Sequence, residues 1–249
     1  EEHKLRTYNI DNDSRFGDWG KWNPWRSPGT AGKGNPKFQP CGVNSGGSAA
    51  SGDPPAAGQP IFANGTDLPA LKNTTTWAAG SVVEASWSIY ANHGGGYSYR
   101  LCPANEPLTE ACFQKTPLKF DRSRQVLKWT NGSLTYPMKD KAVFVDGNVT
   151  FPAGSEWARN PIPIDPTDFA PPCDEPDPFA PAPVPFGNVT PTRCWGNFPS
   201  HVQVIDFLEV PRDLPSGEYV VGWRWDGEQS AQIWSACSDV SIADADVGR

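Results

Sequence analysis

Proline and glycine occur along this chain of 249 residues at a density that disfavours long helices: it holds 27 Pro and 24 Gly, about a fifth of all positions. Proline lacks a backbone donor, and glycine weakens the interior of a helix or strand. Between these residues lie short runs in which apolar and polar side chains alternate. The pattern predicts an all-β fold with many short strands and long ordered loops.

The alternating runs predict strands at 81–91, 97–102, 125–130, 202–210, 218–225 and 231–242. In the first run Val83, Ala85 and Trp87 share one face, as expected for a half-buried strand. The Gly94-Gly95-Gly96 segment that follows is permissive enough to reverse the chain. We find no internal repeat and no helix of normal length. The predicted architecture is an antiparallel β-sandwich.

Two segments lack alternation and are predicted as loops within a single domain that spans residues 1–249. Residues 1–60 form a long N-terminal loop region. Residues 152–193 form a Pro-rich excursion, with twelve prolines from Pro152 to Pro191. A central strand would need donors that proline lacks. A disordered interdomain linker is the alternative, but Cys173 and Cys194 and several Phe residues favour an ordered loop.

Six cysteines and six glycosylation sequons indicate the compartment. None of the cysteines forms a Cys-x-x-Cys pair, so a zinc or redox site is disfavoured. Six cysteines allow about 15 pairings, of which we expect Cys41–Cys237, Cys102–Cys112 and Cys173–Cys194. The sequons begin at Asn12, Asn64, Asn73, Asn131, Asn148 and Asn188. Together these features predict a secreted, disulfide-bonded glycoprotein that carries N-linked glycans.

Charge and hydropathy exclude two classes of partner. The net charge is −7 and no basic stripe is present, which argues against nucleic-acid binding. No apolar run approaches the roughly 20 residues that span a bilayer. No signal peptide is present in the 249 residues, which is what a mature form would show.

Two motifs carry a family resemblance: Ala91-Asn92-His93-Gly94-Gly95-Gly96-Tyr97 in mid-chain, and Ala231-Gln232-Ile233-Trp234-Ser235-Ala236-Cys237 near the end. The resemblance also includes Asn23–Gly29, Cys41–Val43 and Leu214–Tyr219. Together they resemble the lytic polysaccharide monooxygenases, copper enzymes that oxidatively cut chitin and cellulose. The match is to an algal or protist branch of the chitin-binding-type group. The resemblance implies an immunoglobulin-like or fibronectin-like sandwich whose flat face displays the copper.

The resemblance also implies roles for individual residues. His93 matches the second copper-binding His of the family, and Gln232 matches its second-sphere Gln. Trp234 stands where many members have an axial Tyr. The family's first ligand is an N-terminal His that chelates through its ring and its free amine, but this chain begins Glu1-Glu2-His3. Two imidazoles without that amine would hold copper more weakly. A degenerate copper site and an enzyme activated by trimming to His3 therefore both stay open.

Aromatic residues near the start of the chain are candidates for sugar binding. Trp19, Trp22 and Trp25 lie within one loop segment. Planar indoles offer apolar faces to sugar rings, while the indole N–H can donate a hydrogen bond. Burial in the core of the sandwich is the alternative. The expected polysaccharide is chitin, cellulose or an algal wall glycan.

Two other catalytic interpretations have little support. The His93-Gly94-Gly95-Gly96 segment imitates the oxyanion loop of esterases, but no Gly-x-Ser-x-Gly motif accompanies it. Asp174, Glu175, Asp177, Asp226 and Glu228 could pair as a glycosidase acid and base. We expect them to be solvated loop carboxylates instead.

The sequence thus predicts an extracellular glycoprotein with a monooxygenase-like sandwich and a degenerate copper site. Its expected role is to bind polysaccharide, or to build extracellular matrix, wall or surface filaments. An active copper monooxygenase is the first alternative. The second is a purely structural subunit that assembles with itself or with a partner glycoprotein.

Overall fold

The structure, a computed structural model, describes residues 10–11, 40–44, 64–71, 74–88, 92, 94–129, 135–162, 202–226 and 233–245. Predictions that fall on other residues lie outside this described part. Within it, none of the helices is long and apolar enough to cross a membrane.

Most of the described residues belong to two β-sheets. The first sheet has seven strands: β10 (Phe144–Val145), β11 (Trp157–Arg159), β5 (Gly96–Pro103), β13 (Gly217–Asp226), β14 (Ile233–Ala243) and β3 (Thr75–Ala78) in spatial order, with β6 (Thr116–Pro117) beside β5. The second has five: β4 (Val82–Ser88), β12 (Val202–Glu209), β8 (Val126–Trp129) and β9 (Thr135–Pro137), with β7 (Lys119–Phe120) beside β12.

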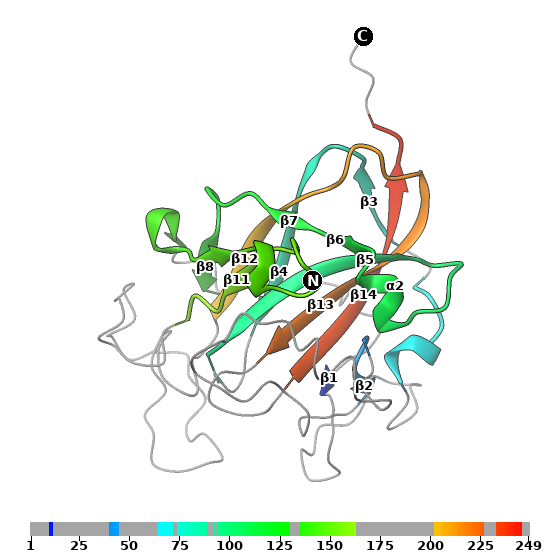
Figure 1. The fold of residues 1–249 in the computed structure, drawn as a ribbon, viewed down its shortest axis with the longest axis horizontal. Helices are drawn as coiled ribbons and strands as arrows, with labels where there is room; N and C mark the ends of the chain where they lie inside the picture. The colour runs from blue at the N-terminus through cyan, green and yellow to red at the C-terminus, as the bar shows by residue number, and fades with distance from the viewer. Residues whose placement is uncertain are drawn as a thin grey trace.

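The remaining elements are short. They are β1 (Ile10–Asp11), β2 (Val43–Asn44), α2 (Glu110–Phe113), and the 3-10 turns η2 (Gly65–Asp67), η3 (Lys139–Lys141) and η4 (Gly147–Val149). The long strands β5, β13 and β14 run side by side, and β1 and β2 lie near β14 (Figure 1).

The two sheets pack face to face, which confirms the predicted all-β sandwich. One continuous apolar cluster contains Leu101 and Trp225 from the first sheet and Leu127 and Leu208 from the second. The pairing is antiparallel throughout the described strands except between β14 and β3, which are parallel. The structure is therefore antiparallel-rich with one parallel edge.

The six predicted strands all occur, with ends shifted by a few residues, but β4 and β5 do not pair with each other. β4 buries Trp87 and exposes Glu84 and Ser86, so one of its faces meets solvent. β5 is buried on both faces over almost its whole length. A strand buried on both faces belongs in the middle of a covered sheet. The segment between them therefore crosses from one sheet to the other.

Several short strands lie where loops were predicted. β11 falls at the start of the predicted excursion 152–193, at three residues that include no proline. It pairs with β10 and β5. β1 and β2 pair with each other inside the predicted loop region 1–60. Strands of two or three residues are too short for alternation to identify them.

A buried carboxylate joins the two sheets. Asp206 of β12 is 1% exposed. Tyr97 Oη donates to its Oδ1 at 2.9 Å, and Tyr99 Oη donates to its Oδ2 at 3.1 Å. Gln125 Nε2 donates to Asp206 Oδ1 at 2.9 Å and to Tyr97 Oη at 2.8 Å. Both tyrosines stand on β5, so the carboxylate holds β12 and β5 in register across the core.

Burial is the largest influence on the pKa of Asp206. Loss of solvent raises the pKa of Asp206 to about 6, against the hydrogen bonds from Gln125, Tyr97 and Tyr99, which lower it. Burial also raises the pKa of Tyr97 and of Tyr99 well above 10.0, with the Asp206 charge adding to the shift. The tyrosines therefore stay neutral donors.

Two of the three expected disulfides are confirmed: Cys41–Cys237 and Cys102–Cys112. The first ties the N-terminal region to β14 over a sequence separation of 196 residues. A crosslink over so long a loop removes unfolded-state entropy worth about 5 kcal/mol. Cys173 and Cys194 lie outside the described residues, so their pairing stays a prediction.

We expect folding stability to fall as pH rises through the range in which Asp206 ionises. The pKa of Asp206 rises from 3.8 to about 6 on folding, so the folded protein binds this proton more tightly than the unfolded chain. The stabilisation is fully present below about pH 4 and is lost as pH rises through 6. Its size is about 3 kcal/mol.

Urea unfolding of the wild type and Asp206→Asn, between pH 4 and pH 7.5, measures this effect. The variant should show a smaller loss of unfolding free energy over that range, by about 3 kcal/mol. An equal loss in both proteins would contradict the assignment.

Candidate functional site

The first candidate site is the end of the sandwich where the chain passes from β4 to β5. Described residues here are Asn92, Gly94 and Gly95, followed by the start of β5. Gly94 has φ of 65° and Gly95 has φ of 81°. These values lie in the left-handed region that glycine adopts without steric cost. The backbone can therefore turn here from one sheet to the other.

Two buried asparagines fix this turn. Asn92 Nδ2 donates to the Ile162 carbonyl at 3.0 Å, and the Gly94 N–H donates to Asn92 Oδ1 at 3.0 Å. Asn160 Nδ2 donates to Asn92 Oδ1 at 2.9 Å. The Ile162 N–H donates to Asn160 Oδ1 at 3.0 Å, and the Asn160 N–H donates to the Gly95 carbonyl at 2.8 Å. The Asn92 side chain and the backbone of Gly94 and Gly95 are thus hydrogen-bonded to the segment after β11.

Tryptophans form the wall beside this turn. Trp225 Nε1 donates to the Gly94 carbonyl at 2.6 Å. Its ring stacks on Trp234, which lies opposite it in the β13–β14 register, with centroids 6.2 Å apart and planes 24° from parallel. Trp87 contacts Trp225 and Trp223 at 6.2 Å and 5.0 Å. Trp225 is buried, whereas Trp223 and Trp234 are only half-buried.

The second candidate is an ion cluster on the outer face of the seven-stranded sheet. Arg100 and Arg224 each donate through Nη1 to Glu110 Oε1, at 2.6 Å and 2.9 Å. Arg224 Nε donates to Asp226 Oδ1 at 3.1 Å. The four side chains are between 0% and 13% exposed. Two cations and two carboxylates therefore share one closed site.

Helix α2 carries Glu110 to this position. Thr109 Oγ1 accepts from the Cys112 N–H at 3.2 Å, which caps the helix. Cys112 is bonded to Cys102 of β5, and Phe113 packs on Gly222, where a Cβ would lie 3.0 Å from the Phe113 ring. Gly222 therefore permits the close approach that places the helix over the sheet.

Burial and charge shift the pKa values of this cluster in different directions. Burial raises the pKa of Asp226 to about 7, although Arg224 lowers it. Burial also raises the pKa of Glu110, but the Arg100 and Arg224 charges lower it by more, so its net shift is downward. Burial lowers the pKa of Arg100. Asp226 is thus the member that changes charge near neutral pH.

The structure overturns one sequence expectation here. Asp226 was expected to be a solvated loop carboxylate, but it ends β13 and is 2% exposed. It is held by Arg224 and cannot meet a polysaccharide as it stands. Glu228, Asp174, Glu175 and Asp177 lie outside the described residues.

Most residues predicted to carry function also lie outside the described part. These are His3, His93, Gln232, Trp19, Trp22, Trp25, Asn12, Asn73, Asn131, Asn188, Cys173 and Cys194. Of the sequons, Asn148 is exposed at the surface turn η4. Asn64 is half-buried, and its Nδ2 donates to Asp67 Oδ2 at 2.8 Å.

The described residues that fall within the copper pattern do not supply a ligand. Trp234 carries an N–H donor and no free lone pair, so its indole cannot coordinate a metal. It packs against the core instead. Within the described ranges no three side chains among His, Cys, Asp and Glu converge on a metal-sized site.

The sequence analysis predicted neither the ion cluster nor the hydrogen-bonded pair of Asn92 and Asn160. The spacing Arg224-Trp225-Asp226 places a cation and a carboxylate on one face of a strand that is otherwise apolar, and that signal was available. Asn160 had no comparable signal. It lies in the Pro-rich segment and meets Asn92 only through the fold.

Comparisons with known proteins give a similarity in structure and none in sequence. No family model matches the sequence, and no curated protein matches it. A solved structure of the AA15 lytic polysaccharide monooxygenase from Thermobia domestica, in the Cu(I) state, is similar with 15% identity and a TM-score of 0.33. The match covers 68% of this chain and 62% of that one, which is less than two thirds of its length.

We expect Asn160→Ala to destabilise the fold. Its side chain donates to Asn92 and accepts from Ile162 inside the protein. Truncation leaves buried polar groups unpaired, at a cost of about 1–3 kcal/mol. Urea unfolding measures the loss, with Ser88→Ala as a control because Ser88 is exposed. Equal stability of Asn160→Ala and the wild type would contradict a stabilising role for the hydrogen bonds between Asn160 and Asn92.

Proposed function

We propose that the protein is a secreted glycoprotein that binds polysaccharide at the Asn92–Trp234 end of its sandwich, without copper chemistry. In this role it serves an extracellular matrix, a wall or a surface filament. Two disulfides support the compartment, because such bonds persist in oxidising surroundings. The exposed sequon at Asn148 is accessible to an N-linked glycan.

The observation that carries the proposal is the half-buried Trp234 stacked on a fixed Trp225. Trp225 is held by its hydrogen bond to Gly94, and Gly94 is held by Asn92. A ring that is already ordered loses little conformational entropy when a sugar packs against it. Each such aromatic contact adds about 0.5–1.5 kcal/mol beyond area burial. Affinity per site would be weak and would increase through avidity on a repetitive polymer.

Trp234 also argues against a working copper centre. An indole at position 234 offers no axial donor, and it forms part of the wall that supports Trp225. A first ligand would further require His3 to be the N-terminal residue of the mature protein. The copper-enzyme alternative depends on trimming to His3.

Retention on insoluble polymer tests the binding role. We expect the wild type to bind at least one of chitin, cellulose and algal wall material, and Trp234→Ala to bind less while still unfolding in one cooperative thermal transition. Phe151→Ala is the matched control, since Phe151 is 39% exposed on the loop after η4. Equal loss in the control would show non-specific adhesion. Assembly without any polymer binding would favour the structural-subunit alternative.

Electron paramagnetic resonance after copper loading tests the proposal that the protein has no working copper centre. With Glu1 retained, we expect no well-defined three-nitrogen copper signal. A signal of that kind that His93→Ala abolishes would overturn the proposal. The same measurement on protein trimmed to His3 tests the enzyme alternative directly.

A further inference from the structure

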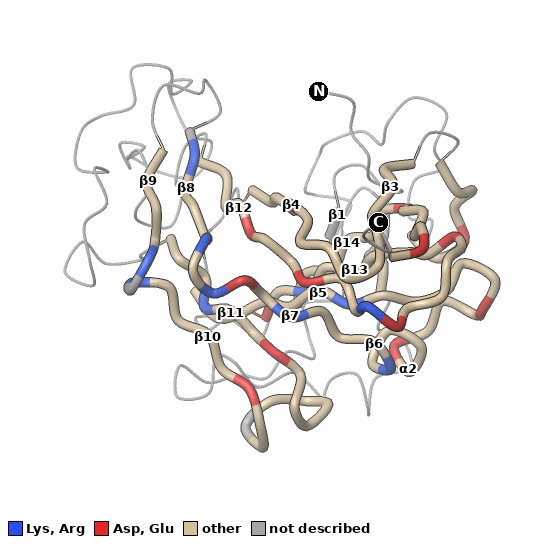
Figure 2. The backbone as a smooth tube through the Cα atoms, turned by 90° about the horizontal axis from the view of Figure 1, so that it is seen from above, with Lys and Arg blue, Asp and Glu red and all other residues tan. Residues whose placement is uncertain are grey.

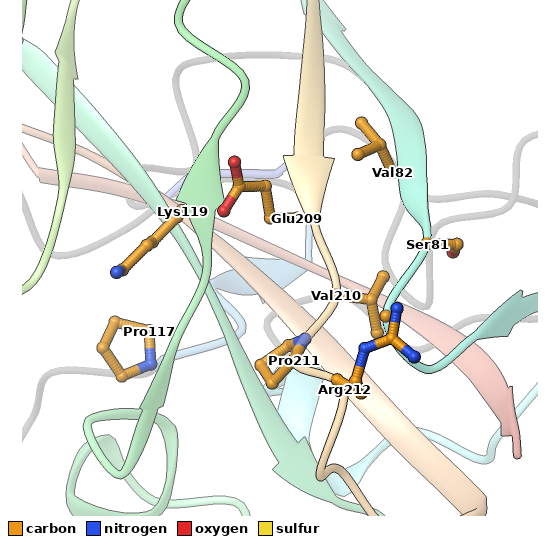
Figure 3. A pocket seen from close by; sticks show the side chains of 9 residues that line it. Ser81, Val82, Pro117, Lys119, Glu209, Val210, Pro211 and Arg212 are labelled. Carbon is orange, nitrogen blue, oxygen red and sulfur yellow. The ribbon is translucent and has the colours of Figure 1, made fainter. Parts of the chain in front are cut away.

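A groove lies at the start of β4, away from the site proposed above, between residues of the five-stranded sheet and Pro117 of β6. Its volume is about 400 Å³, within the range of sites that hold small ligands. Val82, Glu209 and Lys119 stand side by side on β4, β12 and β7 in matching register (Figure 3). Pro117, Val210, Pro211 and Arg212 complete the lining, with Gly80 and Ser81.

The distance between the two sites follows from β4. The groove includes Val82, the first residue of the strand, whereas the Asn92 turn follows its last residue, Ser88. At ~3.3 Å per residue, the two ends of β4 lie about 20 Å apart. A ligand in the groove therefore does not touch Trp234.

The charges in the groove are unpaired. Lys119 and Glu209 are direct cross-strand neighbours, yet in the described part of the chain neither they nor Arg212 form an ion pair or a side-chain hydrogen bond. Elsewhere in the described chain Lys and Arg residues are interspersed with Asp and Glu (Figure 2). Two cations and one carboxylate around a single hollow leave a local excess of positive charge on a protein of net charge −7.

The wall of the groove is rigid where Arg212 lies. The Gly80 N–H donates to the Val210 carbonyl at 3.0 Å, and the Val210 N–H donates to the Ser81 carbonyl at 2.9 Å. The Arg212 side chain lies over Gly80, since a Cβ at Gly80 would lie 3.4 Å from Arg212 Cβ, Cγ and Cζ. Gly80 has φ of 77°, so glycine suits this turn. The Arg212 side chain thus packs on backbone that hydrogen bonds hold in place.

We propose that this groove binds an anionic sugar unit, a uronate or a sulfated pyranose, of an extracellular polysaccharide. Lys119 and Arg212 pair with the carboxylate or sulfate, for which Arg has matching geometry. Glu209 accepts hydrogen bonds from ring hydroxyls, and Pro117 and Pro211 offer apolar surface to the C–H face of the ring. A simple anion would use only the cations, so Glu209 is the residue that favours a sugar.

This inference extends the proposed polysaccharide role to a second surface and a charged substrate class, and it can fail independently. Calorimetry at 0.1 M salt, where repulsion beyond about 10 Å is screened, measures binding of polygalacturonate, a sulfated galactan and a neutral β-glucan. We expect one or both anionic polymers to bind and the neutral one not to bind at this groove. Absence of binding to both anionic polymers overturns the inference.

Paired variants locate the site. Lys119→Ala/Arg212→Ala should weaken anionic binding at least tenfold and leave retention on neutral polymer unchanged. Lys139→Ala/Lys141→Ala changes the net charge equally at η3 and should bind like the wild type. An equal loss in both pairs would show that overall charge, not the groove, governs binding.

Glu209→Ala separates sugar recognition from charge attraction. Removing the carboxylate strengthens a purely electrostatic site, but weakens one in which Glu209 accepts sugar hydroxyls. We expect at least threefold weaker binding. Tighter binding of this variant, or competition by polyglutamate as effective as that by polygalacturonate, would overturn the sugar assignment. These side chains are exposed, so the variants should fold, and thermal unfolding checks this.

Discussion

The hydrogen bonds around the Asp206 carboxylate are the constraint on which the sandwich depends. A buried carboxylate is costly unless donors surround it, and Tyr97, Tyr99 and Gln125 surround this one. The donors come from the opposite sheet and from the residue before β8. The relative position of the two sheets is therefore one in which every donor reaches this carboxylate. The aromatic residues that contact Tyr97 then follow from that position.

From this fixed core the molecule presents two different surfaces. At one end, asparagines and a tryptophan hold a glycine turn, and a half-buried indole stands beside it. At the start of β4, Lys119, Arg212 and Glu209, which form no ion pair within the described part of the chain, line a groove with proline walls. The first surface suits the apolar face of a sugar, and the second suits a charged group. Hydrogen bonds hold the backbone of both surfaces, so recognition needs little backbone rearrangement.

The ion cluster under α2 has a structural role. Arg100 and Arg224 converge on Glu110 and hold the helix against the sheet next to both disulfides. Since Asp226 shares this closed site and its pKa is raised to about 7, its ionisation costs stability as pH rises toward neutrality. Asp226 and Asp206 shift in the same direction, so the contribution of each to stability decreases as pH rises toward neutrality.

Local pattern alone was enough to predict the class of fold and its long strands. Alternation identified β4, β12, β13 and β14, because side-chain period and burial follow from the backbone geometry of a strand. The Cys41–Cys237 and Cys102–Cys112 bonds were expected among about 15 possible pairings, and the tertiary structure decided them. Only the tertiary structure decided that β4 and β5 lie in different sheets, that Asn160 meets Asn92, and that Asp226 is buried. Those contacts join residues that are far apart in the chain. Their energies depend on how completely the rest of the fold shields them from water, and a short stretch of sequence does not contain that information.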